Sequence, residues 1–258
     1  MSRRSDPEGD GQRARFLQLL EQAAERCQKI VFWWRDDDAE DATPQLDQLV
    51  EMSRRFDLPL GLAVVPRGAT EALAARLAGE KRIAVLQHGF GHLRHSPEGE
   101  KKAEFGDHRP LADMQSELEA GKDKLRRLFP NLLPVLVPPW NRIGETGDAA
   151  RRAAGLTGLS LYGPKREPDP HLVNTHLDIF DWKGTRGPMA RAQAYSILCD
   201  EVERRIGGDA EPIGILSHHL IHQDASWALL EEVFAALRRH PAVDWPQIPD
   251  VFGLESDR

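Results

Sequence analysis

The sequence has few cysteines and no long hydrophobic run. Its two cysteines, Cys27 and Cys199, lie far apart in a chain of 258 residues, so neither a disulfide framework nor a cysteine-based metal site is indicated. We expect both to be small buried apolar side chains. No window approaches the roughly 18 consecutive apolar residues of a transmembrane helix, so no membrane insertion is expected. The polar N-terminus also lacks the apolar run of a signal peptide, which predicts a cytoplasmic location.

An excess of positive charge is also missing. The chain carries 34 Lys+Arg against 41 Asp+Glu, a formal net charge of −7. This balance gives no electrostatic reason for binding nucleic acid, which we therefore do not expect as a partner. With 40% hydrophobic and 29% charged residues, the composition is that of a globular protein. The length fits one barrel-sized domain as well as two small ones.

Short apolar runs alternate with longer amphipathic ones from Ile30 onward, the pattern of repeated βα units around a parallel sheet. The predicted strands are residues 30–34, 60–65, 82–87, 134–137, 158–161, 176–180 and 213–217. The predicted helices are residues 44–56, 69–79, 111–129, 146–154, 188–206 and 224–239. Proline follows a plausible N-terminal cap at Thr43-Pro44, and Gly187-Pro188 is a similar start. We predict a flexible tail over residues 1–12 and a single domain over residues 13–258.

Most of the unusual polar residues come directly after the predicted strands. The first strand runs into Asp36-Asp37-Asp38, the third into His88 to His92 and the last into His218-His219. Because the carboxyl ends of parallel strands share one rim, these loops should converge. Three adjacent carboxylates in a confined site need a nearby cation, since like charges raise one another's pKa.

His88 and His92 have the i, i+4 spacing of many zinc sites, which we place on one side of a helical turn. With one carboxylate of the acidic triplet they form a two-histidine, one-carboxylate set that leaves positions open for water and substrate. His95 fits better as an exposed loop residue. Because alternate residues of a strand point to opposite faces, only one of His218 and His219 should enter the site.

Two further segments carry aromatic residues at the same rim. Pro138-Pro139-Trp140 reads as a turn that ends a strand, and prolines there can hold the next backbone amide toward an oxyanion. Asp178 lies within the sixth predicted strand, and Asp181 and Trp182 follow it. Spacing alone leaves their role open, between a loop acid beside a core aromatic and a part of the site.

Taken together, these motifs resemble the NodB-type polysaccharide deacetylases, a metal-dependent carbohydrate esterase family. The resemblance extends over about residues 30–220 and implies an α/β fold, a distorted (β/α)7 barrel. Its motifs correspond to Asp36-Asp37, His88 to His92, Pro138-Pro139-Trp140, Asp181-Trp182 and Leu216-Ser217-His218.

The resemblance implies a role for each of these positions. Asp36 would be the general base, His218 the general acid, and Asp37 the metal ligand beside His88 and His92. The backbone amide of Trp140, after Pro139, would bind the oxyanion. The implied cofactor is a divalent metal ion, most simply Zn, and the substrate an N-acylated carbohydrate or a small amide.

The sequence departs from the family at three places. Asp38 replaces a usual glycine, so either Asp37 or Asp38 could be the ligand. Val137 replaces the arginine that orients the base, a function that Arg142 or Arg35 could take over. Gly89 replaces a hydroxyl residue that supports the histidine loop. Other possible supporting residues are Asp181, Trp182 and His219.

The leading hypothesis is a metal-dependent deacetylase, and the departures from the family put its substrate class in more doubt than its metal. A non-catalytic metal- or carbohydrate-binding protein on the same barrel is the alternative. Retention of a candidate base, ligands and acid together argues against it. A different metal-dependent reaction at the same rim is a third possibility, because one fold hosts many chemistries.

Overall fold

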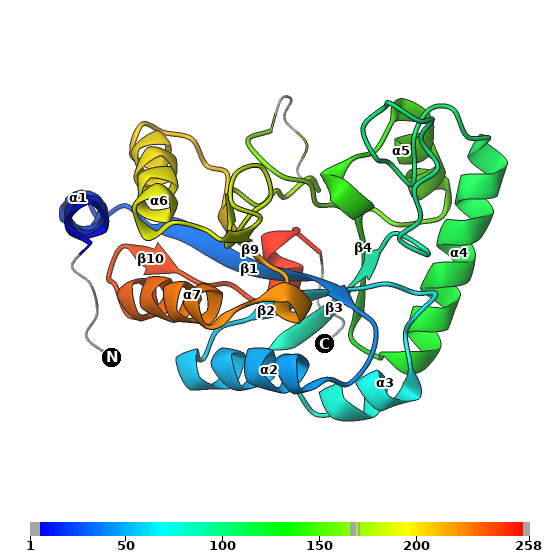
Figure 1. Ribbon diagram of the computed structural model, residues 1–258, viewed down its shortest axis with the longest axis horizontal. Coiled ribbons are helices and arrows are strands. Elements are labelled where there is room, and N and C mark those ends of the chain that lie inside the picture. Colours follow the sequence, from blue (N-terminus) through cyan, green and yellow to red (C-terminus); the bar gives the residue numbers. More distant parts are fainter. Residues whose placement is uncertain (1–5, 166–168, 170, 255–258) are drawn as a thin grey trace.

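We describe the protein from a computed structural model, which covers residues 6–165, 169 and 171–254. Its strands alternate with helices along the chain (Figure 1). The strands are β1 (Ile30–Ala39), β2 (Leu60–Val64), β3 (Ile83–His88), β4 (Leu132–Val137), β5 (Gly158–Leu159), β6 (Leu177–Asp178), β7 (Phe180–Asp181), β8 (Gly187–Pro188), β9 (Ile213–Ser217) and β10 (Val243–Asp244). The helices are α1 (Pro7–Glu25), α2 (Pro44–Phe56), α3 (Glu71–Leu77), α4 (Leu111–Leu128), α5 (Glu145–Ala153), α6 (Arg191–Ile206), α7 (Asp224–Leu237) and α8 (Ile248–Val251), with short 3-10 turns η1 (Pro139–Asn141) and η2 (His219–Ile221).

The main sheet is parallel and runs in the order β5-β4-β3-β2-β1-β9-β6, with β10 beside β1. Parallel bridges from Leu159 to Leu172 and from Tyr162 to Thr175 join the β5 end to the segment leading into β6. The sheet therefore curls back on itself, and the predicted distorted (β/α)7 barrel is confirmed. β7 and β8 form a separate antiparallel pair.

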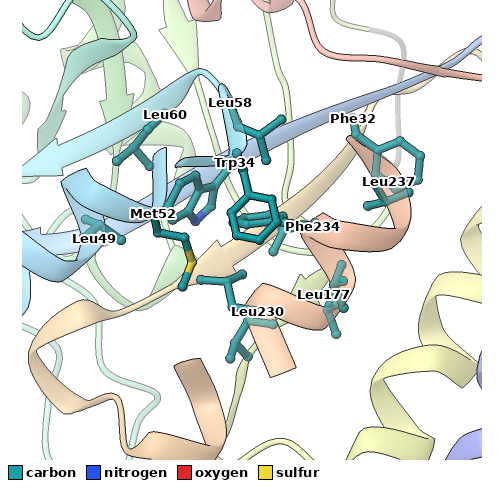
Figure 2. Packing of buried hydrophobic residues seen from close by; sticks show 14 of the residues in the cluster. Phe32, Trp34, Leu49, Met52, Leu58, Leu60, Leu177, Leu230, Phe234 and Leu237 are labelled. Atoms are coloured by element: carbon teal, nitrogen blue, oxygen red, sulfur yellow. The ribbon is translucent and has the colours of Figure 1, made fainter. Parts of the chain in front are cut away.

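Alternation along β1 divides the core into two layers. Phe32 and Trp34 point outward beneath the helices, where the Trp34 ring lies 4.7 Å from that of Phe234 in α7 (Figure 2). Trp33 points inward and packs with residues such as Val137 of β4. Truncating a buried tryptophan such as Trp34 to alanine should cost about 3–5 kcal/mol. The same alternation decides where the acidic residues that follow will point.

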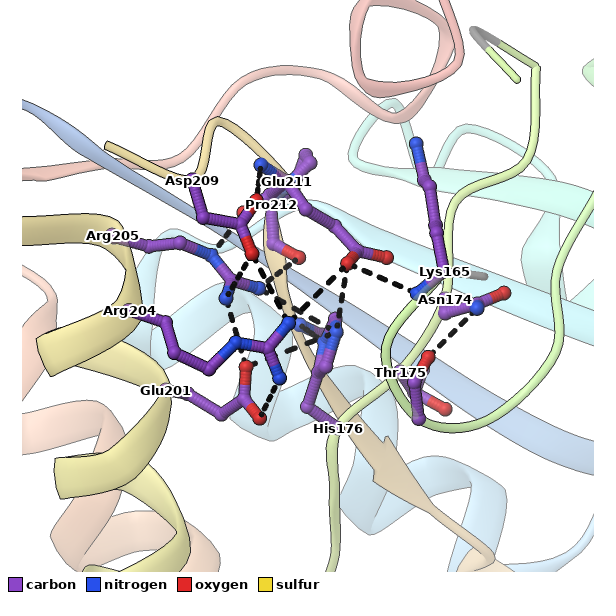
Figure 3. A network of polar contacts seen from close by, with 12 residues as sticks. Lys165, Asn174, Thr175, His176, Glu201, Arg204, Arg205, Asp209, Glu211 and Pro212 are labelled. Carbon is purple, nitrogen blue, oxygen red and sulfur yellow. Dashed lines mark hydrogen bonds and ion pairs between the residues drawn. The ribbon is translucent and has the colours of Figure 1, made fainter. Parts of the chain in front are cut away.

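A buried ionic network secures the segment that closes the barrel (Figure 3). His176, just before β6, accepts a hydrogen bond from the Gly214 backbone at Nδ1, and its Nε2 lies 3.5 Å from the Glu211 carboxylate. Arg205 of α6 pairs with Glu201 of the same helix at 2.9 Å and donates from Nε to the backbone carbonyl of Glu211, just before β9. Helix α6 is thereby tied to the sheet beside β9.

The N-terminal region differs from the sequence prediction. Residues 1–5 of the predicted tail lie outside the described residues, but helix α1 begins at Pro7, so residues 7–12 are helical. Asp6 caps this helix at the Gly9 amide, and Arg191 of α6 binds Asp10 at 2.8 Å. Because the acidic first turn has a basic partner, it is held against α6, where the two helices lie side by side (Figure 1).

Other boundaries need smaller corrections. β1 continues to Ala39, five residues beyond its predicted end, and the predicted strand 176–180 is divided between β6 and β7. The predicted start of the fifth helix at Gly187-Pro188 is wrong, because these residues pair with β7 and α6 begins at Arg191. Cys199 is buried as predicted, but Cys27 follows the end of α1 and is exposed. Thr43 caps α2 as predicted. No helix among the described residues is long and apolar enough to span a bilayer.

Candidate metal centre and active site

A cavity of about 590 Å³ opens at the rim where the carboxyl ends of the strands meet. Its walls include most of the residues singled out from the sequence, namely Asp37, Asp38, His88, His92, Trp140, Arg142, Asp178, Asp181, Trp182 and His218. A second cavity of about 700 Å³ lies near the amino ends of β3 and β4, and its walls contain neither a carboxylate nor a histidine. The convergence predicted from the strand ends therefore occurs at the first cavity.

The three aspartates of the acidic triplet have different surroundings. Asp36 is fully buried on the outward face of β1, where its carboxylate binds Ser217 Oγ at 2.5 Å and His219 Nδ1 at 2.5 Å. It also accepts a hydrogen bond from the His219 backbone at 3.1 Å. Although burial opposes it, the His219 ring lowers the pKa of Asp36. Asp36 does not line the cavity, so its expected position as the base is wrong: its oxygens join β1 to the start of η2.

Asp37 faces the barrel interior and is paired with Arg35. Its Oδ2 accepts a hydrogen bond from Arg35 at 3.0 Å, while its Oδ1 lies 2.9 Å from Arg35 Nε without a suitable hydrogen-bond angle. Arg35 is itself buried and donates to Asn141 Oδ1 at 2.6 Å and to Ser160 Oγ at 2.7 Å. Of the two arginines considered in place of Val137, Arg35 contacts the acidic triplet, whereas Arg142 is exposed and binds the Lys102 carbonyl.

Asp38 is the member of the triplet that meets the histidines. Its Oδ1 lies 3.0 Å from His88 Nε2 and 3.3 Å from His92 Nε2, and one ligand atom from each of the three residues lies within 4.8 Å of the others. Asp38 has a φ of +72°, and the pairing of β1 with β2 shifts register between Asp36 and Ala39. This bulge breaks the alternation and turns the side chain toward the cavity. The sequence left open whether Asp37 or Asp38 is the metal ligand. The geometry favours Asp38, because Asp37 is not part of the cluster.

His88 and His92 approach each other through a loop, so the predicted helical turn is wrong. His88 ends β3, and left-handed φ angles of +59° at Gly89 and +55° at His92 bring the two ring centroids to 5.1 Å. His88 Nδ1 lies 2.9 Å from the Val137 carbonyl, an arrangement in which Nδ1 carries the proton and Nε2 is free to bind a metal. His95 is exposed, as predicted.

Charges within the cluster shift the pKa values of its members. Although burial opposes both changes, contact with His88 lowers the pKa of Asp38, and the carboxylates of Asp37 and Asp38 raise the pKa of His88. Burial, together with the neighbouring His88, lowers the pKa of His92. Two imidazoles and one carboxylate at this spacing fit a divalent metal ion, and Zn²⁺ suits the donor set.

His218 lines the same cavity as the histidine loop. Its Nδ1 is 3.7 Å from Asp178 Oδ1, and its ring meets the Trp182 ring edge-on at 5.1 Å. Although burial alone would lower it, Asp178 raises the pKa of His218 to about 9. His219 points away toward Asp36, so only His218 of this pair enters the cavity, as the alternation predicted.

The remaining predicted residues form the walls or support the loops. Pro139 is buried, and Trp140 packs on the His92 ring at 4.7 Å with a left-handed φ of +58°. The Asp181 carboxylate accepts hydrogen bonds from the backbone amides of residues 183–185 and so stabilises a turn. Trp182 donates to Asp178 Oδ2 at 2.8 Å.

Sequence reasoning missed Glu104, which holds the histidine loop. This buried carboxylate accepts hydrogen bonds from the backbone amides of Phe90, Gly91 and Leu93 at 3.2, 2.8 and 3.3 Å. A Cβ atom at Gly89 would lie 2.1 Å from Glu104 Oε2, so the carboxylate fills the space where the family has a hydroxyl side chain. No local motif marks Glu104 in the sequence.

The fold is that of the polysaccharide deacetylases of carbohydrate esterase family 4, as shown by solved structures with barrels of the same kind. A candidate polysaccharide deacetylase from Mycobacterium smegmatis is 14% identical, with a TM-score of 0.64 over 88% of this chain and 90% of that one. A family 4 carbohydrate esterase from Streptomyces lividans is 13% identical, with a TM-score of 0.57 over 86% and 95%. A family 4 acetyl xylan esterase from Clostridium thermocellum, solved with a cobalt ion, is 10% identical, with a TM-score of 0.54 over 87% and 93%. No family model and no curated protein matches the sequence.

Proposed function

We propose that the protein is a metal-dependent hydrolase that removes an acyl group, most simply acetyl, from an N-acylated sugar or a related amide. The main support is the cluster of Asp38, His88 and His92 in the same cavity as a carboxylate, Asp37, and an imidazole, His218. Among the similar solved structures, one is named an acetyl xylan esterase, which cleaves an ester, and another a peptidoglycan N-acetylglucosamine deacetylase, which supports removal of an acetyl group from an amide. Asp38, His88 and His92 would hold the ion, Zn²⁺ being the most suitable. When bound, such an ion polarises a carbonyl group and lowers the pKa of water.

Asp37 is proposed as the general base. Its carboxylate is oriented by Arg35, and Oδ1, although 2.9 Å from Arg35 Nε, accepts no well-aligned hydrogen bond from the described residues. An attacking water could pass its proton to this oxygen as it adds to the acyl carbon. Arg35 is in turn fixed by Asn141 and Ser160, so the carboxylate has little freedom to rotate.

His218 is proposed as the general acid. With a pKa raised to about 9 it carries a proton at neutral pH, which it can give to the amide nitrogen as the C–N bond breaks. Asp178 stabilises the imidazolium, and Trp182 packs against its ring. The products are then a free amine on the sugar and a carboxylate.

The backbone amide of Trp140 is proposed as the oxyanion donor. The left-handed φ angles at Trp140 and Asn141 turn the chain sharply after the two prolines, beside the histidine cluster. A fixed amide at this position would stabilise the negative charge that develops on the carbonyl oxygen.

The experiment combines metal analysis with acetate release from a panel of N-acetylated sugars. We expect about one divalent ion per chain, and loss of the ion in His88→Ala. Asp37→Asn and His218→Gln should retain the ion and lose turnover, while His95→Ala, an exposed histidine outside the cavity, should behave as wild type. Tight metal and sugar binding without acetate release would instead favour the non-catalytic alternative.

A further inference from the structure

We infer that the sugar accepted by this cavity carries an anionic group, a carboxylate or a phosphate, in addition to its N-acyl group. The inference rests on the proposed function and concerns the substrate class of the same site. It starts from three cationic residues, Lys102, Arg142 and Lys183, which lie near the two tryptophans that line the cavity, Trp140 and Trp182.

Lys102 and Arg142 lie on the Trp140 side of the cavity. Arg142 and Trp140 both line it, and Lys102 Nζ lies 5.8 Å from the centre of the Trp140 ring. The Arg142 guanidinium donates to the Lys102 carbonyl at 3.0 Å, which connects the two segments. Two positive charges thus lie beside one aromatic wall.

Lys183 is the neighbour of Trp182 in the chain and lines the cavity with it. Trp182 is 50% exposed. The neighbouring Asp181 uses its carboxylate on the backbone amides of the turn, including that of Lys183 at 3.2 Å. Its hydrogen bonds therefore fix the loop backbone and leave the Lys183 ammonium group for another partner.

Some arginines elsewhere on the surface, such as Arg55, Arg82 and Arg152, pair with a carboxylate, while others in the described part of the chain, such as Arg126, do not. Lys102, Arg142 and Lys183 differ from these in their position around one cavity. Within residues 6–165, 169 and 171–254, no carboxylate pairs with Lys102, Arg142 or Lys183. In a chain with a net charge of −7, positive side chains without partners at one cavity indicate complementarity to an anionic ligand.

The carboxylates of the cavity do not reverse this conclusion. Four acidic residues line the walls, namely Asp37, Asp38, Asp178 and Asp181. Arg142, Lys183 and the two charges of a divalent ion offset them, and Lys102 adds a further positive charge. The acids also lie at the proposed reaction centre or within hydrogen-bonded turns, whereas the cations flank the tryptophans. An anionic group on the part of the sugar away from the N-acyl group would therefore lie near the cations and not near the acids.

The experiment compares kcat/KM for three substrates. N-acetylglucosamine is the neutral reference, N-acetylglucosamine 1-phosphate supplies a phosphate, and N-acetylmuramic acid supplies a carboxylate. We expect at least one anionic sugar to exceed the neutral sugar by roughly tenfold or more, as for hydrogen bonds to charged groups. This preference should fall toward 1 in Arg142→Ala and Lys183→Ala and should weaken at high salt. Lys81→Ala, a cation at the second cavity, is the matched control and should retain the preference.

A binding measurement separates this inference from the proposed function. Calorimetry on metal-loaded protein, with glucosamine 1-phosphate and glucosamine as non-hydrolysable probes, should show tighter binding of the phosphate and loss of that advantage in Arg142→Ala. Acetate release from neutral and anionic sugars at equal efficiency would overturn the inference and leave the proposed function intact. Tighter phosphate binding without acetate release from any sugar would support the anion preference and contradict the hydrolase.

Discussion

Replacing Asp38 by asparagine should weaken metal binding far more than the same change at Asp37. Asp38 Oδ1 lies 3.0 and 3.3 Å from the free ring nitrogens of His88 and His92, and it is the anionic member of the cluster. Loss of a residue that merely supports a ligand costs about 10–100-fold in metal affinity. Removal of the anionic ligand should therefore cost more than roughly 100-fold. Asp37→Asn keeps the cluster intact and should cost less than roughly tenfold.

The assay is competition for zinc between metal-stripped protein and a chromophoric chelator at neutral pH. Asp38 is only partly buried, so the isosteric change should leave the circular dichroism spectrum unchanged. Asp123→Asn, at an exposed position of α4, is the matched control. Equal loss of zinc affinity in Asp37→Asn and Asp38→Asn would refute the assignment, as would wild-type affinity in Asp38→Asn.

Three other predictions concern residues around the cluster. Asp36→Ala should lower the free energy of unfolding in urea by about 3–5 kcal/mol, because it leaves the buried His219 without its partner. Since the pKa of Asp36 is lowered in the folded protein, the contribution of Asp36 to stability should be lost as the pH falls below about 4. In metal-free protein, NMR titration should show His218 losing its proton near pH 9, and Asp178→Asn should lower that pKa. Because this pKa is raised above an unfolded value of about 6.5, the pair stabilises the fold fully below that pH and ceases to do so as the pH rises through 9. Gly89→Ser, which restores the residue type of the family, should lower the melting temperature, since its φ is +59° and its Cβ would lie 2.1 Å from Glu104. A serine variant as stable as wild type would contradict that reasoning.

The order of strands and the convergence of their ends could be predicted from the sequence, because both follow from local apolar runs and parallel pairing. The exact use of the acidic triplet could not. Had the first strand been extended to Ala39, alternation from the inward Trp33 would have placed Asp37 inside and Asp36 outside. The sequence-based prediction ended this strand at residue 34 because a run of four charged residues is rarely buried in a strand. Here Arg35 and Asp36 have partners in distant segments, and Asp37 pairs with Arg35 on the same strand.

Asp38 could not have been assigned by alternation even with the correct strand end. The register shift between Asp36 and Ala39 arises from the pairing of β1 with β2, and the three aspartates themselves do not indicate a bulge. Aspartate is among the few residues that tolerate a positive φ, so the bulge needs no glycine. Glu104 escaped detection for a similar reason, since it acts on backbone amides more than ten residues away.

Arg35 shows how a distant contact can be preserved when the sequence motif that usually supplies it is missing. The resemblance to the deacetylases places an arginine immediately before the double proline on β4, where this chain has Val137. Arg35 lies two residues before Asp37 on β1 and points to the same interior face. It donates a hydrogen bond to the Asp37 carboxylate at 3.0 Å. The valine is buried in the inner core, and Asn141, just after the prolines, accepts a hydrogen bond from Arg35 at 2.6 Å. The guanidinium therefore still joins the acidic strand to the proline turn, although it now comes from the strand. If this connection orients the base, Arg35→Lys should reduce kcat more than it raises KM, because an ammonium group cannot bind Asp37, Asn141 and Ser160 in one plane.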